Sequence, residues 1–114
     1  MFLLIAHFAV PPGTTPQRAL LDADEPVRLL AAQPDTRWLR WARSTEDANA
    51  LLLVAQFDTA AAYRRAQSPL EVRAVLIPWL SGAEVSASGA FEVITAADAG
   101  VLSRPEVTVP DPGR

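Results

Sequence analysis

Two short apolar runs limit the folds open to this 114-residue chain: FLLIAHFAV at residues 2–10 and ALLLVAQF at residues 50–57. Each is bounded by turn-forming residues and is too short to cross a membrane as a helix, so each indicates a β-strand. Side chains alternate between the two faces of a strand. Phe2 and Leu4 therefore share one face and Leu3 and Ile5 the other, which makes both faces of the predicted sheet apolar.

Two further segments indicate strands with more polar character. Residues 36–44 (TRWLRWARS) combine tryptophans, which favour strands, with arginines, and residues 45–49 form a polar turn after them. Residues 84–94 end in AFEVI and predict the last strand. Because charged side chains suit the edges of a sheet, we expect these two strands outside and the two apolar runs in the centre.

The segment between the first two strands indicates a helix. Thr15 is a suitable N-cap, Pro16 suits the first helical position, and an apolar side continues to Gln33. Pro26 lies inside this segment, so we expect a kinked or split helix.

A second helical region follows the third strand and opens at Asp58 or Thr59. Ser68 with Glu71 three residues later predicts a capping box that starts a further helical segment. An apolar stripe of helical spacing follows at Val72, Val75, Leu76, Trp79 and Leu80.

The predicted order is therefore βαββαβ. With right-handed crossovers, this order closes into a four-stranded antiparallel sheet with both helices on one face, which is an α+β fold of the ferredoxin-like type. We assign the domain to residues 1–94. Residues 95–114, rich in Ala, Pro and Asp, are interpreted as a C-terminal tail with a short strand at 106–109.

The second apolar face of the sheet predicts a homodimer. The helices can cover only one face, and an uncovered apolar face is an interaction surface. A second copy related by two-fold symmetry is the simplest cover, which would give a dimeric α/β barrel. We expect the tail to pack across the partner subunit.

Charge and composition argue against other classes of protein. The net charge is −3, from 13 acidic residues against 10 arginines, which does not favour nucleic-acid binding. The absence of cysteine excludes disulfides and thiolate chemistry. The opening run lacks a basic start and a cleavage site, so we expect a cytoplasmic protein without membrane contact.

These segments, in this order, resemble the antibiotic biosynthesis monooxygenase family. AHFAVPPG (6–13) resembles its first strand, and AAQPDTRWLRWARSTED (31–47) the passage from its first helix into its second strand. LLLVAQFDTAAAYRRAQSPLEVRAVLIPWLS (51–81) resembles its third strand and second helix. The resemblance covers roughly residues 2–94, and it implies a homodimer with a pocket between the helices and the sheet of each subunit.

The resemblance also implies an activity. Characterised oxygenases of the family bind a flat polycyclic phenol or anthrone and use no metal, flavin or haem, because the deprotonated substrate itself donates an electron to dioxygen. Their third strand supplies an asparagine and a tryptophan, and their second helix a tyrosine. The matching positions here are Leu53, Phe57 and Tyr63, so the resemblance implies that Tyr63 orients the substrate beside Leu53 and Phe57.

A haem-degrading branch of the family ligates iron through a histidine on the second helix. The only histidine here is His7, in the first strand, so no haem is expected. The acidic residues lack histidine or cysteine companions, so no metal site is expected either.

His7 is a second catalytic candidate because its unperturbed pKa lies near neutrality. It lies opposite Phe8 and so points towards the predicted dimer interior, where it can serve as a base or as a hydrogen-bonded structural residue. Gln56 shares this face by parity and could reach His7 across adjacent strands.

Two tryptophans are candidates for ligand binding. Trp38 shares a strand face with Arg40, and an arginine beside an aromatic ring can bind an anionic aromatic ligand or can simply be solvated. Trp79 belongs to the helical stripe and is expected in the core, with a wall of the pocket as its functional alternative.

The sequence thus predicts a cofactor-independent monooxygenase acting on an aromatic polyketide or quinol-type small molecule. The alternative is a non-catalytic dimeric small-molecule-binding or accessory protein, or a polyketide cyclase or isomerase, on the same scaffold. Leu53 and Phe57 favour the binding alternative, because an apolar pocket can hold a flat ligand but has few groups that move protons.

Overall fold

The fold is a four-stranded antiparallel sheet with helices on one face, as seen in a computed structural model that describes residues 1–106. The sheet strands are β1 (Phe2–Ala9), β2 (Trp38–Arg43), β3 (Ala50–Phe57) and β4 (Gly89–Glu92). The helices are α1 (Pro16–Ala31), α2 (Ala60–Gln67), α3 (Leu70–Leu80) and the 3-10 helix η1 (Val85–Ala87). A separate two-stranded hairpin consists of β5 (Ala96–Asp98) and β6 (Val101–Ser103).

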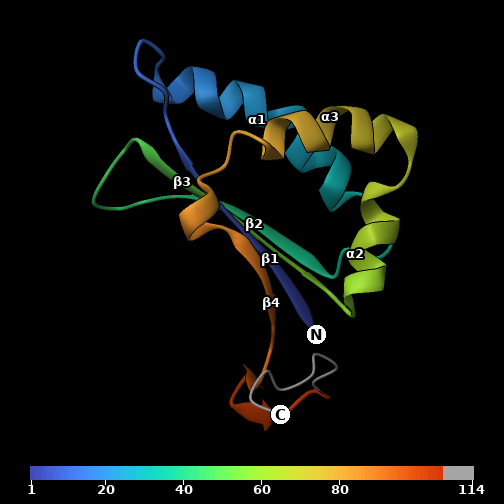
Figure 1. Cartoon of the computed structure of the whole chain (residues 1–114). Coiled ribbons are helices and arrows are strands. Elements are labelled where there is room, and N and C mark those ends of the chain that lie inside the picture. The colour runs from blue at the N-terminus through green and yellow to red at the C-terminus, as the bar shows by residue number, and fades with distance from the viewer. Residues whose placement is uncertain (107–114) are drawn as a thin grey trace.

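The strand order is β2-β3-β1-β4, which confirms the ferredoxin-like α+β fold and the central position of the two apolar strands. Helices α1, α2 and α3 lie together above the sheet in Figure 1. None of the helices in the described part of the chain is both long and apolar enough to cross a membrane.

Strand parity divides the central side chains between two faces. On the helix-covered face, Phe2, Leu4 and Ala6 of β1 are buried, and so are all four residues of β3 that share this face: Leu51, Leu53, Ala55 and Phe57. On the opposite face, Leu3, Ile5, Leu52 and Val54 are only half-buried, because no helix lies over them. We refer to this second surface as the open face.

Helix α1 begins where the sequence predicts but is not split at Pro26. The Thr15 hydroxyl accepts a hydrogen bond from the Arg18 amide at 3.2 Å. The helix then continues as one element to Ala31, so the predicted split is wrong, while the alternative of a kink stays a prediction. Pro26 is buried between Ala23 and Leu30 on the same side of the helix, and this packing offsets the backbone hydrogen bond that proline cannot make.

The predicted capping box at Ser68 is also wrong. Thr59 caps α2 as expected, accepting from the Ala62 amide at 3.1 Å. Ser68, however, ends α2, and its hydroxyl donates to the Arg65 carbonyl at 2.9 Å. Pro69 follows as the N-cap of α3 without a side-chain hydrogen bond, so Ser68 is committed to the preceding helix.

The last sheet strand is shorter than the predicted segment 84–94. Only Gly89–Glu92 pair with β1, after η1. The reason lies at His7, whose amide donates to Ser88 Oγ at 2.9 Å and whose carbonyl accepts from the Glu84 amide at 2.8 Å. A serine side chain and a loop amide thus take up the hydrogen bonds of the His7 backbone, which further pairing with β4 would otherwise use.

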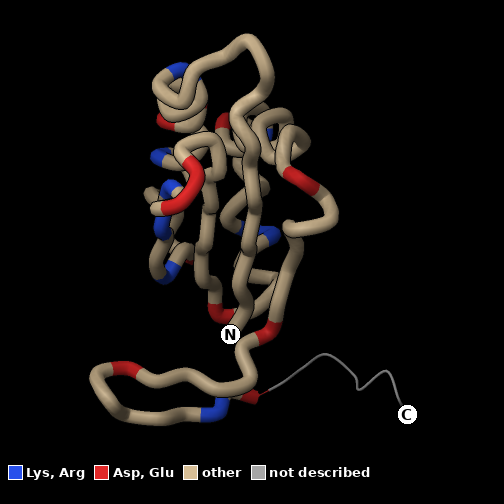
Figure 2. Tube along the Cα trace, turned by 90° about the vertical axis from the view of Figure 1, so that its left-hand side faces the viewer, with Lys and Arg blue, Asp and Glu red and all other residues tan. Residues whose placement is uncertain are grey.

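The chain after the sheet contains the β5–β6 hairpin, which the sequence did not predict. Ala99 and Gly100 both have positive φ, 50° and 83°, as a two-residue hairpin turn requires. The hairpin projects from the body of the domain, on the side of the sheet away from the helices, in Figures 1 and 2. Val101 and Leu102 are exposed. The strand predicted at 106–109 is absent at residue 106, and its other residues lie outside the described part of the chain.

Candidate functional site

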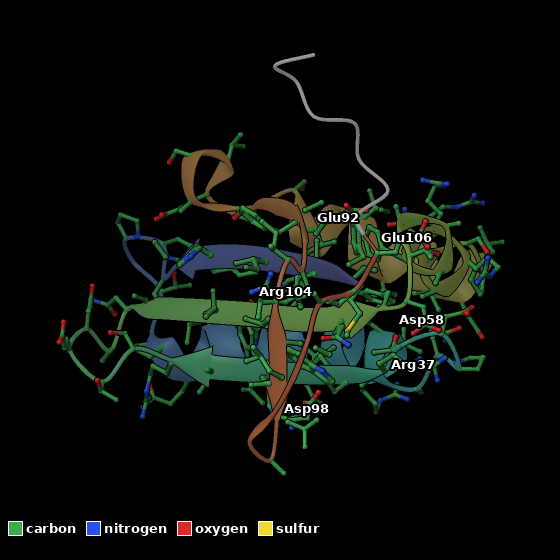
Figure 3. The ribbon with its side chains drawn as sticks, turned by 90° about the horizontal axis from the view of Figure 1, so that it is seen from below. Arg37, Asp58, Glu92, Asp98, Arg104 and Glu106 are labelled. Atoms are coloured by element: carbon green, nitrogen blue, oxygen red, sulfur yellow. The ribbon has the colours of Figure 1, made fainter. Side chains whose placement is uncertain are left out.

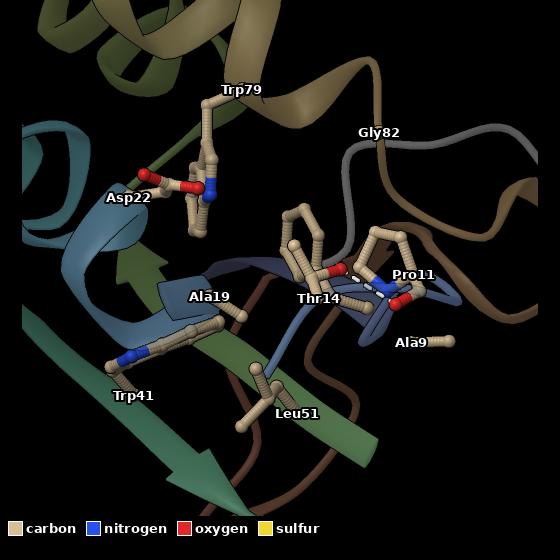
Figure 4. Close-up of a pocket in the computed structure, with 10 residues that line it drawn as sticks. Ala9, Pro11, Thr14, Ala19, Asp22, Trp41, Leu51, Trp79 and Gly82 are labelled. Atoms are coloured by element: carbon tan, nitrogen blue, oxygen red, sulfur yellow. Dashed lines mark hydrogen bonds between the residues drawn. The ribbon is translucent and has the colours of Figure 1, made fainter. Parts of the chain in front are cut away.

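An apolar cavity of about 180 Å³ opens between the sheet and helices α1 and α3. It is lined by Phe8, Ala9, Pro11, Thr14, Ala19, Asp22, Trp41, Leu51, Trp79 and Gly82 (Figure 4). Pockets with mainly apolar walls and few polar groups are typical binding sites for small molecules.

Three aromatic rings from three elements form the main wall of this cavity. Phe8 of β1 stacks on Trp79 of α3 with ring centroids 4.4 Å apart and an angle of 20° between the ring planes. Trp41 of β2 meets both edge to face, at 5.7 Å from Phe8 and 5.4 Å from Trp79. The rings hold one another in place, so they present a preformed aromatic surface.

The elements around the cavity follow from the sheet register. Trp41 pairs with Leu53 and Phe8 with Leu51, so both rings lie on the helix-covered face at the same end of the sheet. Figure 4 shows Trp79 extending from α3 towards them. The loop before α1 closes the side of the cavity, and there the Thr14 hydroxyl donates to the Pro11 carbonyl at 2.6 Å.

Tyr63 lies in a second aromatic cluster, away from this cavity. Its ring stacks on Phe2 at 5.4 Å and meets Phe57 at 5.1 Å. Phe2 and Phe8 are six residues apart on β1, which separates the two clusters by about 20 Å. Burial raises the pKa of the Tyr63 phenol, so the side chain is neutral near pH 7 and is not a ready proton acceptor.

Leu53 and Phe57 are both 0% exposed and belong to the core beneath the helices. Neither lines the cavity, although Leu53 lies beside Trp41 on the neighbouring strand. Of the predicted ligand-binding residues on this face, Trp79 alone among the described residues lines the cavity.

The other predicted site residues lie on the open face, on the far side of the sheet from the cavity. Arg40 stacks over the Trp38 ring at 5.6 Å, which places the predicted pair together at the β2 edge. His7 lines a shallow depression of about 300 Å³ with Ala42 and Leu52. The structure thus distributes the predicted residues over both faces.

The predicted contact between His7 and Gln56 is wrong. They share the open face, but His7 pairs with Leu52 and Gln56 with Leu3. Four residues along the strands therefore separate them, or about 13 Å. Gln56 instead donates to the Met1 sulfur at 3.1 Å.

A second cavity, of about 220 Å³, lies at the other end of the sheet and has acidic walls. Asp58, Glu92 and Glu106 line it together with Met1, Phe2 and Thr59 (Figure 3). The Arg37 guanidinium donates to Asp58 at 2.8 Å, and this hydrogen bond lowers the pKa of the Asp58 carboxyl. Within residues 1–106, no group of three histidine or carboxylate side chains is arranged to hold a metal ion.

Sequence reasoning missed Phe8, Trp41 and Asp22 as parts of the cavity. The two aromatic residues could have been found from parity, because Phe8 alternates with His7, and Trp41 lies on the opposite face from Trp38 and Arg40. Nothing in the sequence distinguishes Asp22 from the other acidic residues of the same helix, which are expected to face solvent.

Comparisons with known proteins point to one family. The model of the family described as "Antibiotic biosynthesis monooxygenase" matches residues 1–75. No curated protein sequence matches the chain significantly.

Several solved structures share the fold at low sequence identity. SnoaB, a cofactor-independent oxygenase from Streptomyces nogalater, is 18% identical with a TM-score of 0.64, over 81% of this chain and 91% of its own. A structure described as an antibiotic biosynthesis monooxygenase is 15% identical with a TM-score of 0.61, over 96% and 100%. Rv0793 from Mycobacterium tuberculosis is 14% identical with a TM-score of 0.62, over 86% and 97%. These similarities concern the fold.

Proposed function

Because the chain belongs to the antibiotic biosynthesis monooxygenase family, we propose that it binds a flat aromatic small molecule beside Phe8, Trp41 and Trp79 and oxygenates it without a cofactor. The observation that carries this proposal is the aromatic wall of the cavity. Flat ring systems stack well on such surfaces, and apolar cavities of this kind are typical small-molecule sites.

The proposed reaction converts an anthrone-type ring into a quinone. The substrate loses two hydrogens from its reactive carbon and gains one atom of dioxygen there as a carbonyl oxygen, while the second oxygen atom leaves as water. The substrate supplies all the electrons, so the balance needs no further reductant. The role of the protein is to hold the ring away from water and close to dioxygen.

A second candidate function is ligand binding without turnover. It is favoured by the burial of Leu53 and Phe57 in the core and by the packing of Tyr63 outside the cavity. With these residues elsewhere, the proposed site has few groups that move protons.

The test incubates chelator-treated protein with emodin anthrone under air enriched in ¹⁸O₂ and under nitrogen. We expect a quinone carrying one ¹⁸O atom, formed only with dioxygen and faster than without protein. Ala19→Phe, which introduces a ring from α1 into the cavity, should abolish both binding and turnover. Gln17→Phe, on the exposed side of the same helix, is the matched control. Binding without conversion would select the second function, and equal activity in Ala19→Phe would refute this cavity as the site.

We also propose that the active species is a homodimer formed through the open face. The centre of that face is apolar, with Leu3, Ile5, Leu52 and Val54, and it continues at β4 with Phe91, which is 50% exposed. The β5–β6 hairpin projects beside it with exposed Val101 and Leu102, which suits an arm that clasps the partner. In this proposal residues 1–94 form the domain, and residues 95–114 contribute the arm.

A charged substitution at the centre of the open face tests the dimer. Ile5→Asp should convert the protein to a monomer in light scattering after size exclusion, because burying an unpaired carboxylate in an interface is unfavourable. Leu21→Asp, on the outer side of α1 where the leucine is 69% exposed, should leave the dimer intact. A dimeric Ile5→Asp variant would place any interface elsewhere.

A further inference from the structure

Asp22 is a charged side chain that helix α1 directs to the aromatic cavity. The buried side of α1 carries Ala23, Pro26 and Leu30. Ala19, one turn before Ala23, and Asp22, one turn before Pro26, line the cavity from α1 (Figure 4). A carboxylate therefore borders an otherwise apolar space, and it is the only charged residue among the described residues that line it.

The carboxylate is only partly engaged by the protein. Arg18, one turn earlier on the same helix, places its Nε 3.1 Å from Asp22 Oδ1. Oδ2 has no hydrogen-bond partner within residues 1–106, and the Asp22 side chain is 54% exposed. An ionised carboxylate offers about four acceptor positions. Asp22 thus keeps acceptor capacity for a ligand.

The other polar side chains of the cavity are weaker acceptors than Asp22 or are not acceptors. The Thr14 hydroxyl donates its proton to the Pro11 carbonyl, so its oxygen can only accept from a ligand, and a neutral hydroxyl oxygen is a weaker acceptor than a carboxylate. The indole groups of Trp41 and Trp79 are donors only. A ligand atom that meets the unoccupied Asp22 oxygen must itself carry a proton, because two acceptors repel each other.

We propose that Asp22 accepts a hydrogen bond from a hydroxyl group on the edge of the bound ring, and thereby selects neutral phenols over their ethers. This inference rests on the proposed function, since it assumes an aromatic ligand in this cavity, and it adds the residue that fixes the orientation of the ligand. The ring stacks on the aromatic wall while its hydroxyl faces α1.

The test compares 1-naphthol with 1-methoxynaphthalene by isothermal titration calorimetry. The wild-type protein should bind the naphthol about 5- to 10-fold more tightly, as expected for a partly exposed hydrogen bond to a charged acceptor. In Asp22→Ala the ratio of the two dissociation constants should fall to about 1, with the ether bound as before. Asp22→Asn should give an intermediate ratio, because its amide oxygen still accepts.

Two variants separate the ligand contact from the ion pair. Arg18→Ala removes the ion pair but keeps the carboxylate, so the preference for naphthol should persist. Asp24→Ala removes an exposed acid of the same helix that does not line the cavity and should change neither constant.

Each remaining outcome is decisive. An unchanged ratio in Asp22→Ala, with both ligands still bound and both displaced by Ala19→Phe, overturns the role of Asp22 and leaves the cavity in place. Failure of the wild-type protein to bind either ligand overturns the proposed site itself. Tighter binding of the 1-naphthylmethylammonium cation than of naphthol would overturn the choice of a phenol in favour of a cationic ligand.

Discussion

Replacing Leu53 by asparagine tests whether this position belongs to the core or to a ligand site. The family resemblance implies an asparagine at this position, whereas in this chain Leu53 is 0% exposed. Its partners on the neighbouring strands are Ala6 and Trp41, and within residues 1–106 no buried polar side chain lies in the core. An amide at this position would therefore meet apolar neighbours.

The expected cost of Leu53→Asn has two parts. The lost apolar burial and packing cost about 2–3 kcal/mol. The buried amide, left without a partner, adds about 1–3 kcal/mol. A total of about 4 kcal/mol is a large share of the roughly 5–15 kcal/mol that stabilises a typical domain. We expect a clear fall in the denaturant midpoint and a Tm lower by on the order of 15 °C.

The assay is urea unfolding followed by tryptophan fluorescence and circular dichroism. Leu53→Met conserves volume and apolarity, so it should cost less than about 1.5 kcal/mol and serves as the control. The reasoning is refuted if the free energy of unfolding of Leu53→Asn lies within about 1 kcal/mol of the wild-type value. A stable Leu53→Asn variant that binds anthrones more tightly would show that Leu53 faces a ligand after all.

Three further predictions follow from the same contacts. Tyr63→Phe should leave anthrone binding and turnover unchanged in the calorimetric and ¹⁸O assays, because this ring packs outside the cavity; loss of turnover alone would restore the family role of Tyr63. The double variant Val101→Asp/Leu102→Asp should weaken the proposed dimer about tenfold or more in sedimentation equilibrium, since both side chains are exposed in the free arm. An unchanged dimer dissociation constant would count against the arm. Asp58 has a folded-state pKa below its unfolded value, so its contribution to stability is present above the unfolded pKa, near 4, and is lost as pH falls through the folded pKa. The urea midpoint should therefore fall less between pH 6 and pH 3 in Asp58→Asn than in the wild type. Equal falls in the two proteins would contradict the ion pair.

The sheet could be predicted from sequence because a strand has a period of two. Once Phe2 and Leu4 are assigned to one face, the faces of all other β1 residues follow, and the observed burial agrees. The register between the strands could not be predicted from this alternation. The separation of His7 from Gln56 depends on the pairing of Leu3 with Gln56, and nothing local in either strand specifies which residues pair across the sheet.

Local signals failed where packing or turn geometry outweighed them. Pro26 predicts a break, but burial on the inner side of α1 keeps the helix continuous. Ser68 has the residue type of an N-cap and serves the preceding helix instead. The β5–β6 turn uses Ala99 at a positive φ in place of the Asn-Gly or Asp-Gly pair that marks such turns, so the hairpin had no recognisable signature.

The division of the predicted site residues between two faces limits the chemistry open to this protein. His7, Trp38 and Arg40 lie across the sheet from Trp79, so a ligand in the aromatic cavity meets none of them in the same subunit. An arginine able to stabilise an aromatic anion is therefore absent from the described lining of the cavity, and the charge that borders it is the negative charge of Asp22. A carboxylate disfavours an anionic ligand. Under the proposed function, the cavity would therefore hold a phenol or anthrone in its neutral form in the ground state.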